Sequence, residues 1–471
     1  MKADCLTDFC EYINQQLEAT GLYLNPKREL AQGQNSSWRI APEPFAIDQN
    51  LYQELKALGK TFLKFYQAAN RLYELTCRGH LPSWIQSYLE QGKTELVLEL
   101  GRMRRTRKDL PFIIRPDIIL TEDGFVVSEL DSVPGGFGLL AALSKIYCEL
   151  NYDLIGGNQG IPQGFAKAIK SCAGKEDPLL AIIVSNESQD YFGEMQWISE
   201  ALRQLGLRSV TIKPEEVVFL DQQGLFLKLN GQLEQIDIVY RFFELFDLKN
   251  IPKMDLILHA VRKRQVVITP PLKSYLEEKS LFALFHHPVL THYWLEQLGE
   301  EHFQRLMKVL PKTWIMDNRP LPPHAIIPGL EIDDQPVSDW QQLKNTTKSE
   351  RELVLKISGF SEQAWGSRGV SIGHDLSAEN WSNAIDQALT SFPNNPYILQ
   401  QFFHGKQVET RYYDFETGEV KNMRGRARLC PYYFVSDNQV ELVGILTTIC
   451  PLDKKLIHGM VDAVMVPTRL L

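Results

Sequence analysis

Short apolar runs alternate with amphipathic segments in the middle of the chain, and this alternation constrains the fold more than any other feature. LLAIIVSN at 179–186, RSVTIK at 208–213 and IDIVYRFF at 236–243 have the length and apolar content of buried strands. YFGEMQWISEALRQLGL at 191–207 has helical spacing. Strands that alternate with helices pack as a parallel sheet covered by helices. The sequence therefore predicts a mixed α/β fold with a parallel layer in its central region.

The segments before this layer have a different pattern. Residues 1–100 have mostly helical spacing. FIIRPDIIL at 112–120 and FVVSEL at 125–130 flank the turn TEDG, and they predict a β-hairpin with Asp123-Gly124 at its tip. PGGFGLLAALSKIYCEL at 134–150 begins with a glycine-rich turn and predicts a helix after it.

The segments after the layer predict a further sheet. LVLKIS at 353–358 and YILQQFF at 397–403 read as strands, and SAENWSNAIDQAL at 377–389 reads as a helix that begins with a Ser-x-x-Asn cap. Residues 311–339 are rich in proline and acidic residues, which predicts a loop or linker.

The composition argues against several classes of protein. The chain has 50 Lys and Arg residues against 58 Asp and Glu, a net charge of −8, whereas non-specific nucleic-acid binding depends on neutralising phosphates with basic residues. Seven scattered cysteines without a CxxC pair argue against a disulfide framework or a zinc site. The apolar stretches are far shorter than the roughly 18 residues of a membrane-spanning helix, and the N-terminus lacks the apolar core of a signal peptide. We expect a cytoplasmic protein with no nucleic-acid or membrane partner.

The predicted hairpin carries the first candidate site. Arg115 and Asp117 are two residues apart on one strand, and Glu129 and Asp131 are two residues apart on the next. Because side chains alternate faces along a strand, each pair lies on one face, and three carboxylates can converge with one guanidinium. Mg²⁺ prefers such hard oxygen ligands together with phosphate oxygens of a substrate. The alternative interpretation is an exposed polar face on which Arg115 forms salt bridges with its neighbours.

A second candidate site combines lysines with a glycine-containing loop. Lys356 lies on a predicted strand, and the loop that follows has Gly366 and Gly369 on either side of Ser367 and Arg368. Small residues let backbone N–H groups approach phosphate oxygens, and a strand lysine supplies a positive charge. A surface loop needs the same residues for its turns alone, so that interpretation stays open. Lys279, taken alone, has the character of a solvated surface lysine.

Taken in order, these segments resemble the circularly permuted ATP-grasp proteins, especially the synthetase domain of glutathionylspermidine synthase. The resemblance spans about residues 100 to 450 and is carried by RPDIILTEDGFVVSELDSVPGG, AIIVSNESQDYFGEMQWISEALRQLGL, IDIVYRFFELFD, TPPLKSYLEEKSLFALF, LVLKISGFSEQAWGSRGVSIG and PYILQQFFHGKQVETRYY. An ordinary ATP-grasp chain presents its phosphate-binding lysines first and its metal-binding carboxylates last. Here the carboxylate hairpin comes before the lysines, which is the order of the permuted family.

The resemblance implies ATP and one or two Mg²⁺ ions as cofactors, and it implies a role for each candidate residue. The metal ligands would be Asp117, Glu129 and Asp131. The nucleotide would be bound by Lys279, Lys356, Gly366, Ser367, Gly369, Gln400 and Gln401. Arg115 and Arg368 would stabilise the transferring phosphoryl group. Asp131 departs from the family, which usually has Asn at this position, and it adds a negative charge to the implied metal site.

The implied activity is that of an ATP-dependent ligase, which joins a small-molecule carboxylate to an amine through an acyl-phosphate. A catalytically inactive nucleotide-binding homologue and an enzyme that phosphorylates a hydroxyl group are the alternatives. The chain is predicted to divide into a helical N-terminal region, the metal-binding strands and helix, a pre-ATP-grasp-like α/β lobe and an ATP-binding lobe, at residues 1–100, 101–175, 176–270 and 271–471.

Overall fold

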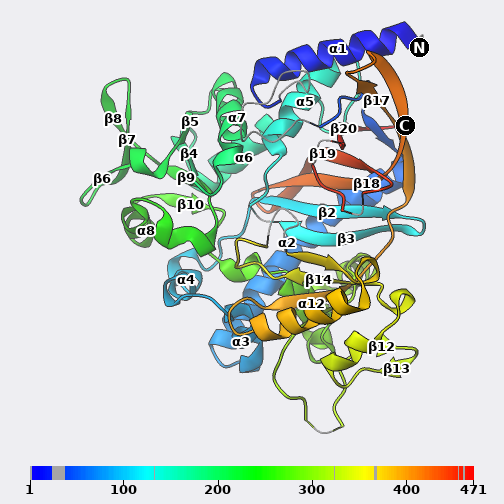
Figure 1. The fold of residues 1–471 in the computed structure, drawn as a ribbon. Coiled ribbons are helices and arrows are strands. Elements are labelled where there is room, and N and C mark those ends of the chain that lie inside the picture. The colour runs from blue at the N-terminus through cyan, green and yellow to red at the C-terminus, as the bar shows by residue number, and fades with distance from the viewer. Residues whose placement is uncertain are drawn as a thin grey trace.

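Three larger sheets organise the protein. The computed structural model describes residues 3–23, 38–131, 133–322, 324–364, 369–454, 456–459 and 462–471. Within these residues one sheet has seven strands and two have four, and two smaller sheets have two and three strands. Figure 1 shows the seven-stranded sheet in the upper part of the molecule, the green α/β lobe beside it and the yellow and orange lobe below it. The mixed α/β class predicted from the sequence is confirmed.

The seven-stranded sheet, here called the large sheet, draws its strands from distant parts of the chain. The spatial order is β1 (Phe45–Ile47), β20 (Val464–Leu470), β19 (Gln439–Pro451), β18 (Glu419–Ser436), β2 (Ile113–Thr121) and β3 (Gly124–Asp131), and β17 (Gln407–Asp414) also pairs with β18. The pairs are antiparallel except that of β1 with β20. The hairpin predicted from the TEDG turn is confirmed as β2 and β3, and it lies next to a strand from the end of the chain.

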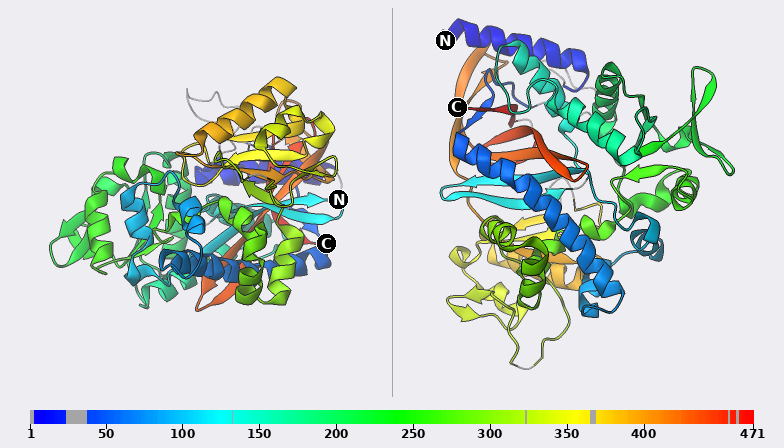
Figure 2. Two further views of the ribbon diagram at one scale, coloured as in Figure 1. Left: turned by 90° about the horizontal axis from the view of Figure 1, so that it is seen from below. Right: turned by 180° about the vertical axis from the view of Figure 1, so that it is seen from behind.

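Helices cover both faces of the large sheet. Because side chains alternate along a strand, Tyr433 and Phe434 point to opposite faces. The Tyr433 hydroxyl donates to the Leu55 carbonyl of α2 (Gln49–Cys77), and Phe434 packs beside Gly164 of α6 (Gly160–Ala173). Figure 2 shows α2 crossing the sheet in the view from behind. Helices α1 (Ala3–Thr20) and α5 (Phe137–Glu149) lie on the side of α6.

The central sheet confirms the predicted parallel layer. Its order is β10 (Val267–Thr269), β9 (Ile238–Phe242), β4 (Leu180–Val184) and β5 (Ser209–Ile212), and the pairs are all parallel. Helices α7 (Phe192–Gln204) and α8 (Met254–Arg262) accompany it, and the small sheet of β6 (Val218–Leu220), β7 (Gly224–Leu229) and β8 (Gln232–Gln235) projects outward (Figure 1). The chain adds strands on both sides of β4, so the order reverses between β4 and β9. Ligands of such sheets bind at this reversal, beyond the carboxyl ends of the strands.

The lower lobe holds an antiparallel sheet in the order β11 (Thr313–Ile315), β16 (Tyr397–Gln401), β14 (Leu353–Ile357) and β15 (Val370–Ile372). The predicted helix is α12 (Ala378–Ser391), and the Ser377 side chain caps it by accepting from the Asn380 N–H. Helices α9 (Ser280–His286), α10 (Thr291–Leu298) and α11 (Glu300–Val309) precede this sheet.

One expectation for this lobe is confirmed only in part, because most of the segment is loop but it also contains short strands. Residues 311–339 were expected to form a loop or linker, but they begin with β11 and contain the hairpin of β12 (Glu331–Ile332) and β13 (Gln335–Pro336). The reason is that apolar residues stand between the prolines: Met316, Leu330 and Val337 are buried in the core of this lobe. A segment whose side chains enter a core cannot act as a free linker.

The first 100 residues are mainly helical as predicted, with α1, α2, α3 (Ser83–Glu90) and α4 (Glu95–Gly101), but β1 lies among them and pairs with β20. The four-part division of the chain and its circular permutation stay predictions. No helix in the described ranges is long and apolar enough to cross a membrane.

Candidate functional site

The hairpin of β2 and β3 brings its four charged residues together as cross-strand neighbours. Arg115 faces Asp131, and Asp117 faces Glu129. The next pair is Ile118 with Val127, so Ser128 is an extra residue and the strands form a bulge beside Asp117. The Ser128 hydroxyl donates to the Asp117 carbonyl over 3.2 Å. The bulge therefore fixes the backbone of the hairpin at the point where its charged side chains meet.

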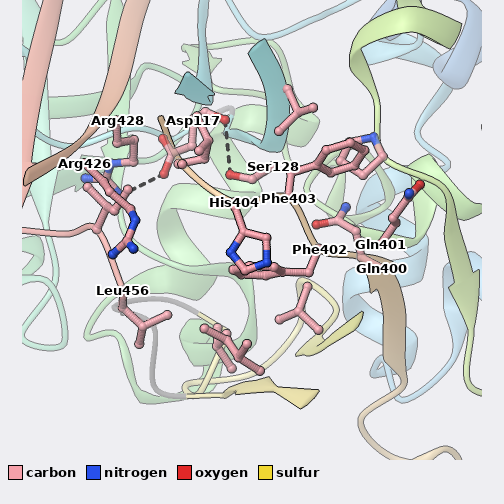
Figure 3. Close-up of a pocket in the computed structure, with 18 of the residues that line it drawn as sticks. Asp117, Ser128, Gln400, Gln401, Phe402, Phe403, His404, Arg426, Arg428 and Leu456 are labelled. Carbon is pink, nitrogen blue, oxygen red and sulfur yellow. Dashed lines mark hydrogen bonds and ion pairs between the residues drawn. The ribbon is translucent and has the colours of Figure 1, made fainter. Parts of the chain in front are cut away.

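Asp117 lies between two arginines. Its carboxylate is 3.1 Å from Arg115 and 2.9 Å from Arg428 of β18, and Arg115 also reaches Asp131 over 3.1 Å. Figure 3 shows the contact between Arg428 and Asp117. Burial alone would raise the pKa of Asp117, but the two guanidinium groups hold it below its usual value. Burial prevails at Asp131 and raises its pKa, although Arg115 acts in the opposite direction. The salt bridges expected for a polar hairpin face are present, but this face is largely buried.

Two lysines of the lower lobe reach the hairpin, and one of them contacts a carboxylate there. Lys356 of β14 donates to the Gln400 side-chain oxygen over 2.8 Å and to the Ser128 carbonyl over 3.0 Å. Burial lowers the pKa of Lys356 to about 8, although Glu129 acts in the opposite direction. Lys279, just before α9, lies 2.9 Å from Glu129 and donates to the Ala364 carbonyl over 2.9 Å. Burial would lower the pKa of Lys279, but Glu129 raises it. Lys279 is thus an ion-paired and largely buried group, not a solvated surface lysine.

The fit of this site to Mg²⁺ rests on the donors that it offers. Each predicted ligand already faces a cation: Asp117 and Asp131 face arginines, and Glu129 faces Lys279. In the part of the chain that the structure describes, no group of three His, Cys, Asp or Glu residues is arranged to hold a metal ion. Mg²⁺ is commonly held by one or two carboxylates together with substrate phosphates. The hard oxygen donors therefore fit an ion that arrives with a nucleotide rather than a preformed metal centre.

A first cavity of about 470 Å³ opens between the large sheet and the sheet of the lower lobe. Its walls are apolar at Ile119, Val126, Val354 and Ile372 and carry polar groups at both ends. Figure 3 shows Arg428 and Asp117 at one end, and Gln400 and Gln401 at the other. Gln400 is buried, and its amide donates to the Thr313 hydroxyl over 3.2 Å while its oxygen accepts from Lys356. Its side chain therefore orients Lys356, a role that the sequence did not suggest.

A second cavity of about 400 Å³ lies on the other side of the charged residues and reaches the order reversal of the central sheet. The segments after β4 and β9 contribute Ser188 and Glu244 to its lining. Both cavities are lined by Asp117, Glu129, Lys356 and Arg428, together with Val370. We call these four charged residues the shared wall.

Two carboxyl groups of the second cavity have raised pKa values. Glu194 of α7 accepts from the Gly138 N–H at the start of α5 over 2.9 Å, and burial raises its pKa to about 7. Burial, followed by the nearby Glu277 carboxylate, raises the pKa of Glu244 to about 8. Strongly shifted carboxyl groups in a cavity are a physical signal of a functional site.

The structure therefore places most of the predicted residues around these two cavities. Arg115, Asp131, Lys279 and Gly369 line the second, Gln400 and Gln401 line the first, and Asp117, Glu129 and Lys356 line both. Gly366, Ser367 and Arg368 lie outside the described residues. Sequence reasoning missed Arg428, Glu194 and Glu244. The pattern RGRARL at 424–429 was a usable signal for Arg428, because its arginines alternate and so share one face of a strand.

Comparisons with known proteins define the fold. No protein-family model and no curated protein sequence matches the chain. A solved structure of a glutathione synthetase-like effector from Globodera pallida, in its apo form, is similar over 100% of this chain and 98% of its own, with a TM-score of 0.60 and 13% sequence identity. A protein proposed to be a gamma-glutamylcysteine synthetase, from Methylobacillus flagellatus, aligns over 84% of this chain and 83% of its own at 15% identity, with a TM-score of only 0.38. The chain thus has the fold of the glutathione synthetase-like effector over its whole length.

Proposed function

We propose that the protein is an ATP-dependent carbon–nitrogen ligase that activates a carboxylate as an acyl-phosphate and then joins it to an amine. The observation that carries the proposal is the shared wall, where two cavities meet at a set of lysine, arginine and carboxylate groups. A nucleotide in one cavity and an acceptor in the other would bring their reacting groups to that wall. The glutathione synthetase-like fold of the first neighbour supports the same class of enzyme.

The first cavity suits the nucleotide. Its apolar walls can receive a base. Residues Gln400 to Phe402, at the end of β16, can offer polar groups to the edge of that base. Lys356 and Lys279 would contact the phosphates, and Asp117, Glu129 and Asp131 would hold Mg²⁺. When bound, the ion would neutralise charge on the phosphate oxygens. Arg115 and Arg428 would stabilise the negative charge that develops during transfer. Gly366, Ser367, Gly369 and Arg368 keep their proposed roles in phosphate binding and phosphoryl stabilisation.

The second cavity suits the carboxylate and the amine. The carboxylate oxygen attacks the γ-phosphorus, the bond to the bridging oxygen breaks, and ADP leaves. The amine nitrogen then attacks the carbonyl carbon of the acyl-phosphate, phosphate leaves, and the nitrogen gives up a proton. Walls that exclude water once the substrates are bound would protect the intermediate from hydrolysis. We propose a small-molecule carboxylate such as a peptide, as in glutathionylspermidine synthase.

One specific observation favours the alternative of an inactive nucleotide-binding homologue. The predicted metal ligands are each engaged by an arginine or a lysine, and Asp131 replaces the Asn of the family pattern. A protein of this kind would bind ATP at the same wall without turning it over, and it would act as a scaffold or regulator.

Measurement of ADP release separates these alternatives. Purified protein is incubated with ATP, Mg²⁺ and pools of small peptides and amines, and amide products are identified by mass spectrometry. The ligase predicts ADP release that needs both a carboxylate and an amine, with one amide formed for each ADP. ATP binding with no stimulated turnover in any pool would favour the inactive homologue. A phosphorylated product that accumulates without an amide would favour the phosphorylation of a hydroxyl group.

A further inference from the structure

The turn between α3 and α4 reaches from the N-terminal helices into the lower lobe. Lys93, in this turn, places its ammonium group 2.5 Å from Glu278, and the two side chains are 0% and 1% exposed. Glu278 directly precedes Lys279, which contacts Glu129 of the shared wall. A fully buried ion pair across 185 residues of sequence is costly to form unless its remaining hydrogen-bonding positions are filled.

The second carboxylate oxygen of Glu278 is satisfied by hydrogen bonds from the segment that follows β14. It accepts from the Ser358 hydroxyl and, over 3.0 Å, from the Gly359 N–H. The ammonium group of Lys93 also lies 5.6 Å from the centre of the Phe360 ring. Lys93 is therefore linked to three consecutive residues. Glu278 connects it to Ser358 and Gly359, and its ammonium group lies over the ring of Phe360. These residues begin the segment 358–364, whose last residue accepts from Lys279.

The same turn makes a second contact with the lower lobe. The Gln91 side chain donates to the Pro393 carbonyl over 2.6 Å, and a Cβ on Gly92 would lie 1.8 Å from the Asn394 carbonyl oxygen. Gly92 has a φ of +72°, which favours glycine. The Ser358 N–H in turn donates to Pro396. The turn thus contacts both the 358–364 segment and the loop before β16.

We propose that the buried pair of Lys93 and Glu278 positions the 358–364 segment beside the Lys279 ammonium group, so that the N-terminal helices control nucleotide binding. Lys93 is a positioning residue, since it lines neither cavity. Gln363 and Ala364, at the far end of the segment, line the second cavity. A displacement of the segment at Ser358 would therefore also move the groups that contact the shared wall. The effect on nucleotide binding rests on the proposed function, whereas the positioning itself does not.

Hydrogen exchange of the full chain, followed by mass spectrometry, tests the positioning without a ligand. In Lys93→Met we expect the amides of 358–364 to exchange about tenfold faster or more. The Glu278 carboxylate, left buried without a cation, must move toward water or take up a proton, and either change weakens its hold on the Gly359 N–H. Lys93→Arg keeps the charge and should restore most of the protection. The matched control is Lys273→Met. Lys273 is 1% exposed and donates to the Asn70 side chain and to the Arg107 and Asp109 carbonyls, away from the segment.

Two results would overturn the positioning role. Equal acceleration in Lys93→Met and Lys273→Met would mean that lost global stability alone explains the change. If Lys93→Met does not fold, the variant Lys93→Met/Glu278→Met replaces the pair by apolar side chains, a change that is often neutral for stability. Unchanged exchange at 358–364 in that folded variant would also contradict the proposal.

Calorimetric titration with ATP and Mg²⁺ tests the consequence for the nucleotide. If the wild-type protein binds no ATP, the proposed function fails while the exchange result still decides the positioning role. If it binds, we expect Lys93→Met to weaken the affinity by about ten- to a hundredfold, as a displaced binding group does, and Lys273→Met to leave it within about threefold. Faster exchange in Lys93→Met with an unchanged ATP affinity would overturn the link to nucleotide binding.

Discussion

The two cavities are similar in size but differ in how their charges are arranged. The first is about 470 Å³ and the second about 400 Å³. Away from the shared wall, the first cavity combines apolar side chains and the amide groups of Gln400 and Gln401 with charged or titratable residues, namely His374, Asp375, His404, Arg426 and Asp453. The second adds Arg115, Asp131, Glu194 and Glu244, and burial raises the pKa of three of these, all carboxyl groups.

This difference indicates that the two cavities do different work. The apolar walls and amide groups of the first cavity suit a flat heterocyclic base, which needs shape and a small number of hydrogen bonds. A cavity with shifted carboxyl groups suits proton transfer and recognition of charged groups. The wall between them belongs to both, and Arg115, Asp131 and Lys279 lie next to it in the second cavity, so these residues should matter for every step. Residues farther from the wall in one cavity should affect one substrate. The predictions below test that division.

The largest effect is expected at Glu129 in the shared wall. Glu129→Ala removes a proposed Mg²⁺ ligand and the partner of Lys279, so Mg²⁺-dependent ATP turnover should fall by about a thousandfold or more, measured as ADP release. The fold should be kept, which thermal unfolding and circular dichroism would check. Glu99→Ala is the control, because this acid is 62% exposed and pairs with Arg262 away from both cavities. Turnover retained in Glu129→Ala would place the metal site elsewhere.

A smaller effect is expected at Lys356, together with a pH dependence. Its ammonium form is needed for phosphate contact, and burial lowers its pKa to about 8. The affinity for ATP should therefore be constant below pH 8 and should fall toward tenfold for each further pH unit. Lys356→Met should bind ATP about a hundredfold more weakly at pH 7, because a charged contact to phosphate is lost.

The substitution Lys356→Arg separates this cause from others. A guanidinium stays charged throughout this pH range, so the fall in affinity above pH 8 should disappear even if the affinity itself changes. Lys279 does not interfere, since Glu129 raises its pKa. If the wild-type and Lys356→Arg proteins show the same pH profile, another group governs the nucleotide site.

The sequence predicted those parts of the site whose residues are close together in the chain. The pairs Arg115 and Asp117, and Glu129 and Asp131, were found because alternation along a strand and a tight turn are local properties. Arg428 was not found, because 311 residues separate it from Asp117 and nothing local indicates that β18 pairs with β2. Lys93 and Glu278 are a further case, with each residue unremarkable in its own segment.

The fold was predicted in the same uneven way. Helices and strands with a clear period were confirmed, including the parallel layer around β4 and β9. The segment 311–339 is mostly loop as predicted, but its short strands and its place in the core were not predicted, since prolines and acids surround the few apolar residues that enter the core of the lower lobe. Glu194 and Glu244 look in the sequence like ordinary helix and loop acids. Their pKa values depend on burial by elements that are distant in the chain, which one segment cannot reveal.

The smallest effect is expected at Glu244, and it tests the division between the cavities most directly. Within the described part of the chain, the Glu244 carboxyl group forms no side-chain hydrogen bond or ion pair, and it lines the second cavity. At pH 9, where the Glu244 carboxyl group is ionised, Glu244→Gln should raise the KM for a cationic amine acceptor by about tenfold, the usual loss for one charged contact, while ATP affinity stays within about twofold. In the wild type, amine affinity should also rise as the pH approaches 8, because the carboxyl group must lose its proton, and Glu244→Gln should lack that rise.

Glu187→Gln is the control, since this exposed acid near the same edge of the sheet lines neither cavity. A variant in which both ATP and amine bind more weakly would contradict the division, and the two cavities would then have to be treated as one site.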